Sequence, residues 1–248
     1  MKKKTHGTVP KLVVGASIAQ LKDIQKTMLD VIPNFLSHSD AQSVIGEKNN
    51  LLKDMRLVWD KYVKGSLYDQ QLLKWQDFYR EFFGKEVDIS KIAIPEKKAD
   101  FTRLVVIAEG LTLNQVFKVC QSNFPCWKYT DDLDESVTQN DRTSDQTYAI
   151  WVRDTVEADE KFKNMSANDL KAKGIKGITL LERMILELGY FKETGKHLDI
   201  ENITLCSGSR DSGGFVLIAH WRDDEFRVVW CHPDDADGSL RCREVVTL

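Results

Sequence analysis

The spacing of apolar residues changes near residue 95, and this change limits the folds that the chain can adopt. In the first part of the chain, apolar residues recur at helical spacing and Pro33 marks a break. From Phe101 onwards, short apolar runs alternate with helical stretches and polar loops. The sequence therefore predicts an α+β protein with a helical region over 1–95 and a mixed domain over 100–248, separated by a charged link that contains Pro95.

Three amphipathic helices are expected in the helical region, as a hairpin or small bundle. The first runs over about 18–32, the second is capped at Ser39-Asp40 and ends near Gly65, and the third runs over about 68–83. The third helix has a broad aromatic side, which we interpret as core, with a groove for a partner as the alternative. Its residues include Trp75, Phe78, Tyr79, Phe82 and Phe83.

The second domain should combine strands with two helices, the first of them capped by Thr112. Helices are expected to begin at Thr112 and Thr179, with a polar loop over 131–146 and a polar helical stretch over 157–173. Gly189 or Gly195 should end the second of these helices. Strands are expected at Phe101–Ala108, Thr147–Val152, Ile203–Cys206, Phe215–Ala219, Phe226–Trp230 and Leu240–Val246.

The last 52 residues, 197–248, have an unusual composition. All 24 lysines lie before this segment, although an even spread would place about five within it, and the segment lacks Met and Gln. Five of the 11 arginines do lie there, so basic residues as such are not avoided. Loops of Ser, Gly, Asp, Arg, His and Cys separate regular anchor residues: Trp221, Trp230, Pro233, Leu240, Arg243, Val245 and Val246. This arrangement indicates a binding surface on a strand scaffold rather than a catalytic site.

Randomised asparagine codons could produce this composition. If both adenines of such a codon vary while the third base stays a pyrimidine, the codon can give Asp, Ser, Gly, His, Cys and Arg. It cannot give Lys, Gln, Glu, Met or Trp. Under this hypothesis Trp221, Trp230, Glu201, Glu225 and Glu244 are fixed positions, and the loop positions vary.

Three segments of this region resemble the variable proteins of diversity-generating retroelements. They are Leu205–Ser209, Phe226–Trp230 and Leu240–Val246. In that family a small-residue strand, an Arg-containing strand and a closing strand frame diversified loops. The resemblance implies a bacterial protein with a C-type-lectin-like domain, related to formylglycine-generating enzymes, and a variable ligand-binding face at about 207–241. The chain departs from the family pattern at Arg210, which stands where Trp is usual, and it lacks the closing Gly-Phe pair.

The variable face predicts the residues that contact a ligand. Small residues of such a face adapt to a ligand, while aromatic, His and Arg side chains supply contact energy. We therefore expect a non-catalytic protein that binds a protein or other macromolecular ligand and needs no cofactor or metal. The helical region would tether the domain, form a homo-oligomer or carry its output. The candidate contacts are Asp211, Ser212, Phe215, His220, Arg222, Asp224, Arg227, Cys231, His232, Asp234, Asp235, Asp237, Ser239 and Arg241.

Other functions stay open at this point. One is a scaffold protein that acts through the aromatic side of the third helix, and another is an enzyme that pairs a tail cysteine such as Cys206 with a histidine such as His220. The Asp-rich runs 131–134 and 234–237 lack the calcium-loop spacing, so solvated turns are favoured there. A plain β-rich subdomain with Asp and Gly turns is the simplest alternative.

Charge and composition argue against several further classes. A net charge of −3 gives no electrostatic reason to expect nucleic acid as a partner. No apolar run is long enough for a transmembrane helix or signal peptide, so we expect a cytoplasmic protein. The five cysteines are odd in number and form no CxxC motif, so they are interpreted as free thiols.

Overall fold

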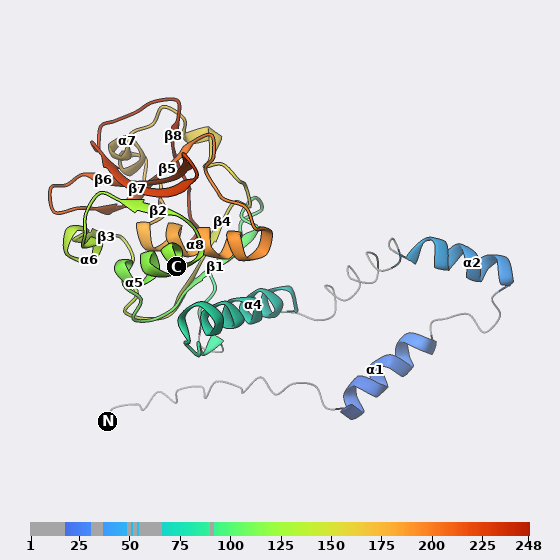
Figure 1. Ribbon diagram of the computed structural model, residues 1–248. Coiled ribbons are helices and arrows are strands. Elements are labelled where there is room, and N and C mark those ends of the chain that lie inside the picture. The colour runs from blue at the N-terminus through green and yellow to red at the C-terminus, as the bar shows by residue number, and fades with distance from the viewer. Residues whose placement is uncertain (1–17, 31–36, 49–50, 52–53, 55–65, 90–91) are drawn as a thin grey trace, which may run out of the picture. The chain divides into compact units, whose positions relative to one another are not determined.

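The computed structural model describes residues 18–30, 37–48, 51, 54, 66–89 and 92–248 (Figure 1). The chain divides into two compact units, Met1–Gln71 and Leu72–Leu248. Each unit is therefore described by itself. Within the described part of the chain, no helix combines the length and the apolar character needed to cross a membrane.

The first unit contains α1 (Ile18–Asp30) and α2 (His38–Gly46), close to the predicted positions. The cap of α2 is Ser37, whose side chain accepts a hydrogen bond from the Asp40 backbone, rather than the predicted Ser39-Asp40. This earlier start places the Asp40 carboxylate in the first helical turn, where it complements the helix dipole. The predicted break at Pro33 and residues 49–50, 52–53 and 55–65 of the predicted second helix lie outside the described residues.

The helix α4 (Ser66–Phe83) confirms the third predicted helix, and its aromatic side is core, as interpreted. From Leu72 onwards the helix belongs to the second unit, where Trp75 Nε1 donates a hydrogen bond to the Leu104 carbonyl at 2.9 Å. The Tyr79 hydroxyl donates to the Val106 carbonyl at 2.6 Å. These bonds occupy the edge of β1 (Arg103–Ile107) that is not paired with another strand among the described residues. The aromatic residues assigned from sequence to 1–95 thus pack in the core of the second unit.

The second unit contains two sheets, and the α+β prediction is confirmed. One is an antiparallel pair, and the other is a mixed sheet of six strands in the order β2-β7-β6-β5-β3, with β8 beside β5. In the larger sheet β2 runs parallel to β7 and β8 parallel to β5, while the other neighbours are antiparallel. The strands are β1 (Arg103–Ile107), β2 (Cys126–Lys128), β3 (Gln139–Asn140), β4 (Tyr148–Val152), β5 (Ile203–Arg210), β6 (Val216–Arg222), β7 (Glu225–Cys231) and β8 (Leu240–Cys242).

Two well-capped helices pack in this unit as the sequence predicts. The N-caps are Thr112 and Thr179, each in a capping box, and Gly195 ends the second helix in the left-handed conformation. The polar stretches differ from prediction, because 131–146 contains a short helix and β3, whereas 157–173 is helical only in part. The helices are α5 (Leu113–Asn123), α6 (Leu133–Ser136), η2 (Glu160–Phe162), α7 (Ala167–Ala172) and α8 (Leu180–Thr194).

The six-stranded sheet lies between α7 on one side and α5 with α8 on the other (Figure 1). Alternate residues of each strand point to opposite faces. Leu217, Ala219, Phe226 and Val228 join the core cluster that contains α5 and α8, and we call this side the α8 face. Val216, Ile218, Leu205 and Cys231 pack with Phe162 and Leu170 on the other side, the α7 face.

The strand β5 extends through Ser207–Arg210, four residues beyond the predicted end at Cys206. The neighbouring chain segment explains why small residues occur there. Gly208 donates a backbone hydrogen bond to the Ile178 carbonyl, and a Cβ atom on Gly208 would lie 2.9 Å from the Gly177 carbonyl oxygen. Likewise a Cβ on Gly177 would overlap the Ser207 side chain. These small residues therefore allow two chain segments to pack closely.

A buried ionic network holds the sheet to α8. Asp199 accepts hydrogen bonds from Arg183 at 3.0 Å and Arg243 at 2.7 Å, and also from the Thr204 hydroxyl. Arg183 also pairs with Glu187 at 2.7 Å, and all five side chains are almost fully buried. The pKa of Asp199 is lowered: its complete burial acts to raise the pKa, but the nearby Arg243 and Arg183 charges outweigh that effect. The two cations balance the two buried carboxylates, so this network fixes the frame on which the tail loops stand.

Candidate functional site

An aromatic cluster occupies one end of the β6–β7 pair. The Phe215 ring lies 4.4 Å from the Trp230 ring and 4.8 Å from the His232 ring, measured between centroids. Trp230 follows Phe226 and Val228 at two-residue spacing, yet it is 40% exposed. His232 is exposed and Phe215 is half-buried. We call Phe215, Trp230 and His232 the Trp230 end.

Tail loops surround the Trp230 end, and they contain several of the predicted contacts. The buried Asp211 carboxylate accepts hydrogen bonds from the Gly213 and Phe215 backbones at 2.9 Å, which shapes the turn before β6. Asp235 accepts from the His232 backbone at 2.8 Å. Ser212, Asp234, Asp235 and Asp237 are exposed in these loops. Asp211 is thus a turn-forming residue, while its neighbours present their side chains to solvent.

Other predicted contacts lie at the opposite end of the same strands. Arg222, Asp224 and Arg227 are grouped around the tight β6–β7 turn. The seven residues of β6 separate this turn from Phe215, a distance of about 20 Å. The predicted contacts therefore form two separate groups rather than one continuous face. The reason is that the length of β6 and β7 separates the two ends of the pair.

A second exposed tryptophan lies beside this turn and belongs to β2. Trp127 lies opposite Arg227 in the parallel register and is 47% exposed. Arg227 is ion-paired with Glu225 at 2.8 Å and Asp223 at 3.0 Å. We call Trp127, Arg222 and Arg227 the Trp127 end. No sequence signal linked Trp127 to this turn, because one hundred residues separate it from Arg227.

His220 is buried beside the Trp127 end. It lies directly opposite Arg227 in the register, and its Nδ1 has no hydrogen-bond partner among the described residues. The pKa of His220 is lowered to about 4, mainly by burial and in addition by the positive charges of Arg222 and Arg227. The imidazole is therefore neutral at pH 7.

The remaining candidates take structural roles. Cys231 is buried on the α7 face. Arg241 of β8 pairs with Glu160 at 2.5 Å, and the backbone and side chain of Ser239 both bond to Asp237. None of these contacts involves Phe215, Trp230 or His232.

The cysteines are held in the thiol form. All five are free, and burial raises the pKa of Cys231, of Cys242 and of Cys126 to about 12. Cys206 points to the α8 face, whereas His220 shares the α7 face with Ile218. A nucleophilic cysteine needs a thiolate next to a base, so this geometry does not favour a Cys206–His220 pair.

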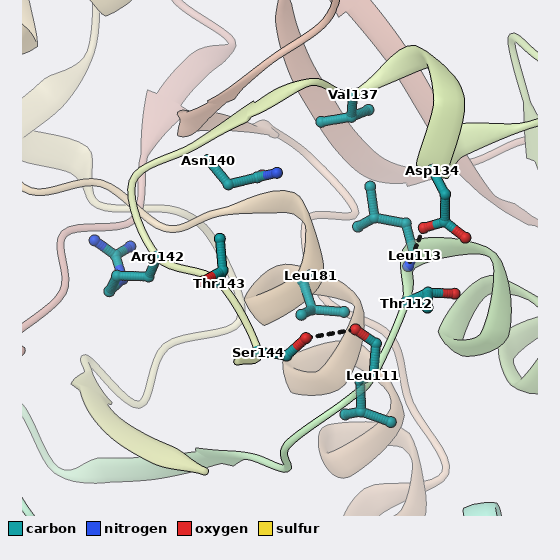
Figure 2. Close-up of a pocket in the computed structure, with 10 residues that line it drawn as sticks. All are labelled: Leu111, Thr112, Leu113, Asp134, Val137, Asn140, Arg142, Thr143, Ser144 and Leu181. Carbon is teal, nitrogen blue, oxygen red and sulfur yellow. Dashed lines mark hydrogen bonds between the residues drawn. The ribbon is translucent and has the colours of Figure 1, made fainter. Parts of the chain in front are cut away.

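A hollow of about 280 Å³ lies near the start of α5 (Figure 2). Its main polar groups bind within the protein, since Asp134 accepts a hydrogen bond from the Leu113 backbone at 2.7 Å and Asn140 accepts one from Ser209. Arg142 points away from the hollow in Figure 2 and pairs with Glu182 at 2.6 Å. The helix N-terminus is thus already occupied by a carboxylate of the protein.

No group of three or more His, Cys, Asp or Glu side chains among the described residues is arranged to hold a metal ion. Comparison of the chain with protein-family models, curated proteins and solved structures gives no match.

Proposed function

We propose that this chain is a non-catalytic binding protein whose ligand contacts the Trp230 end, as in the variable proteins of diversity-generating retroelements. The C-type-lectin-like character of the second unit is part of this proposal. The resemblance in the tail and its lysine-free composition motivate it.

One observation carries the proposal most directly. A tryptophan that is 40% exposed lies on a phenylalanine at the end of a buried sheet, between two loops of variable-type composition. Exposed aromatic rings on a rigid support are the side chains that dominate binding energy at protein interfaces. From the sequence we interpret Trp230 as a fixed anchor, and we propose that it is also the central ligand contact.

The division between fixed and variable positions supports the same function. The anchors Leu240, Arg243, Val245 and Val246 are buried, whereas Ser212, His232, Asp234 and Asp235 are exposed. The predicted contacts Asp211, His220 and Cys231 are buried and depart from this division. Substitution of exposed loop residues usually changes stability by less than about 0.5 kcal/mol. A fixed interior with replaceable loops is what diversification requires.

The DNA around the gene tests the proposal. We expect a near-identical non-coding copy of the DNA that encodes the tail, with differences at adenines, together with a reverse transcriptase gene. A locus with neither feature would contradict the retroelement assignment. Differences that changed codons of the buried anchors as often as codons of the exposed loops would contradict the assignment of the binding face.

A further inference from the structure

The Trp230 end lies between two acidic segments of the chain. The first is 131–135 with four carboxylates, and the second is 234–237 with three. Neither segment contains a lysine or arginine. All seven carboxylates belong to exposed residues. These carboxylates therefore produce a negative electrostatic potential in the solvent around the aromatic cluster.

Backbone hydrogen bonds place both acidic segments near the cluster, the second through a bond from the Asp235 N–H to the His232 carbonyl at 3.0 Å. Tyr129 donates to the Val228 carbonyl at 3.1 Å, so the chain continues alongside β7 toward Trp230 as it approaches Asp131. Ser212 donates to the Ser136 carbonyl at 2.9 Å, which fixes α6 against the loop before Phe215. The second acidic segment begins two residues after His232.

These carboxylates are not neutralised within the described part of the chain. None of the seven forms an ion pair with a described residue, although several accept hydrogen bonds from neutral groups. Cations near these segments include Lys128, whose ammonium group donates to the Asp131 carbonyl and the Asn114 amide oxygen. Lys163 lies beside Gly238, and the charge of the half-buried Arg210 acts on the Cys231 thiol. The surface thus has an excess of negative charge around an exposed indole ring.

We propose that the Trp230 end binds a cationic polypeptide segment, with a Lys or Arg side chain over the Trp230 ring and neighbouring cations beside the two acidic segments. An indole is the best aromatic partner for a cation. No cation of the described residues lies over the Trp230 ring, although seven other aromatic rings have one. This inference rests on the proposed binding function and names its ligand class.

Peptide titration of the full chain tests the inference. The probes are acetylated tetra-arginine amide and acetylated tetra-glutamate amide, and the readout is the indole N–H signal of Trp230, identified with W230F. We expect saturable shifts with tetra-arginine only, and binding about tenfold weaker when ionic strength rises from about 20 to 200 mM. For W230A, which lacks this signal, binding is measured by calorimetric titration alongside wild type, and we expect it to be about tenfold weaker or more.

Two matched controls separate this site from general charge attraction. W127A removes a tryptophan of similar exposure at the other end of β7, and it should leave tetra-arginine binding unchanged. The double variant D131N/E135Q removes two carboxylates that accept no hydrogen bond from described residues, and it should weaken binding. D223N/D224N removes the same charge at the Trp127 end and should change binding by less than about twofold.

Equal effects of W127A and W230A, or of the two double variants, would overturn the inference, and so would an unshifted Trp230 signal. Shifts with tetra-glutamate and not with tetra-arginine would overturn the ligand class while the binding function stands. The DNA locus decides the retroelement proposal independently of these titrations.

Discussion

An exposed tryptophan lies beside each end of β7, Trp127 of β2 at one end and Trp230 at the other. The charged residues around the two rings differ. Beside Trp127, the Arg227 guanidinium is paired with Asp223 and Glu225, so the local charges largely satisfy one another. Around Trp230, the acidic residues of 131–135 and 234–237 have no ion-pair partner among the described residues. Exposure of an aromatic ring is therefore an incomplete sign of a binding site, and an unbalanced charge beside it is the more specific sign.

The two ends stay apart because the sheet between them is rigid. We expect the stability of this sheet to depend most strongly on Asp199. Asp199→Asn should lower the free energy of unfolding by about 3–5 kcal/mol, because it leaves the buried Arg243 without its carboxylate and Arg183 with Glu187 alone. Asn tolerates the left-handed backbone that Asp199 adopts at φ 55°, so the charge is the main change. Urea unfolding at pH 7 measures the effect.

The control for this change is Asp131→Asn, an equal change of an exposed carboxylate, with an expected cost below about 0.5 kcal/mol. The lowered pKa of Asp199 gives a second test. Its stabilisation is present above the ordinary Asp pKa and is lost as pH falls toward the lower folded value. Equal stability of both variants would mean that the network does not hold the frame.

The buried His220, beside the Trp127 end, should make the free energy of unfolding depend on pH. His220 has a folded pKa of about 4, below its ordinary value of 6.5, so the unfolded chain binds a proton first as pH falls. Its contribution to stability is complete above pH 6.5 and is lost toward pH 4. Between pH 7 and 4.5 the loss should be about 2 kcal/mol.

His220→Gln should remove this part of the pH dependence, measured as the difference in unfolding free energy between the two pH values. His232→Gln is the matched control, because His232 is exposed at the Trp230 end. An identical pH slope for wild type and H220Q would show that the imidazole at the Trp127 end is not buried in its neutral form.

A smaller effect should follow removal of the ring that supports Trp230. Phe215→Ala should cost about 1–2 kcal/mol, since Phe215 is half-buried and its contact with Trp230 adds to the area buried. Phe226→Ala, at a fully buried position of β7, should cost about 3–5 kcal/mol. Thermal or urea unfolding of both variants gives the comparison, and a Phe215→Ala cost as large as that of Phe226→Ala would place the cluster in the core.

The smallest expected effect is a difference in fluorescence quenching. Caesium ions should quench Trp230 more strongly than Trp127, and iodide should quench Trp230 less strongly than Trp127, because the carboxylates attract the cation and repel the anion. The contribution of each ring is the difference between wild type and W230F or W127F. A preference of Trp127 for caesium equal to that of Trp230 would remove the contrast between the ends.

Local signals allowed much of the fold to be predicted. Thr112 and Thr179 begin helices because their hydroxyls accept the free backbone N–H groups of the first turn, and Gly195 ends α8 because it adopts the left-handed conformation without strain. The main β-strands follow from apolar runs. β2 and β3 were missed because they have three and two residues, and only pairing with distant strands defines them.

The candidate site could be predicted only in part. The loops around 211–215 and 232–239 were identified by composition, and they do adjoin one another at the Trp230 end. Arg222, Asp224 and Arg227 were assigned to the same face, but strand length places them at the other end. Neither Trp127 nor the acidic segment 131–135 could be connected to the tail, since their proximity depends on strand register.

The sequence by itself determined the class of fold, the ends of the main helices and a tail composition that suits a binding surface. These properties depend on residues close in the chain, such as a cap and its first turn. The tertiary structure decided which tail residues are buried, how they divide between two ends, and which acidic residues surround Trp230. The reason is that burial and electrostatic fields depend on atoms near in space, and the sheet brings together residues that are far apart in the sequence.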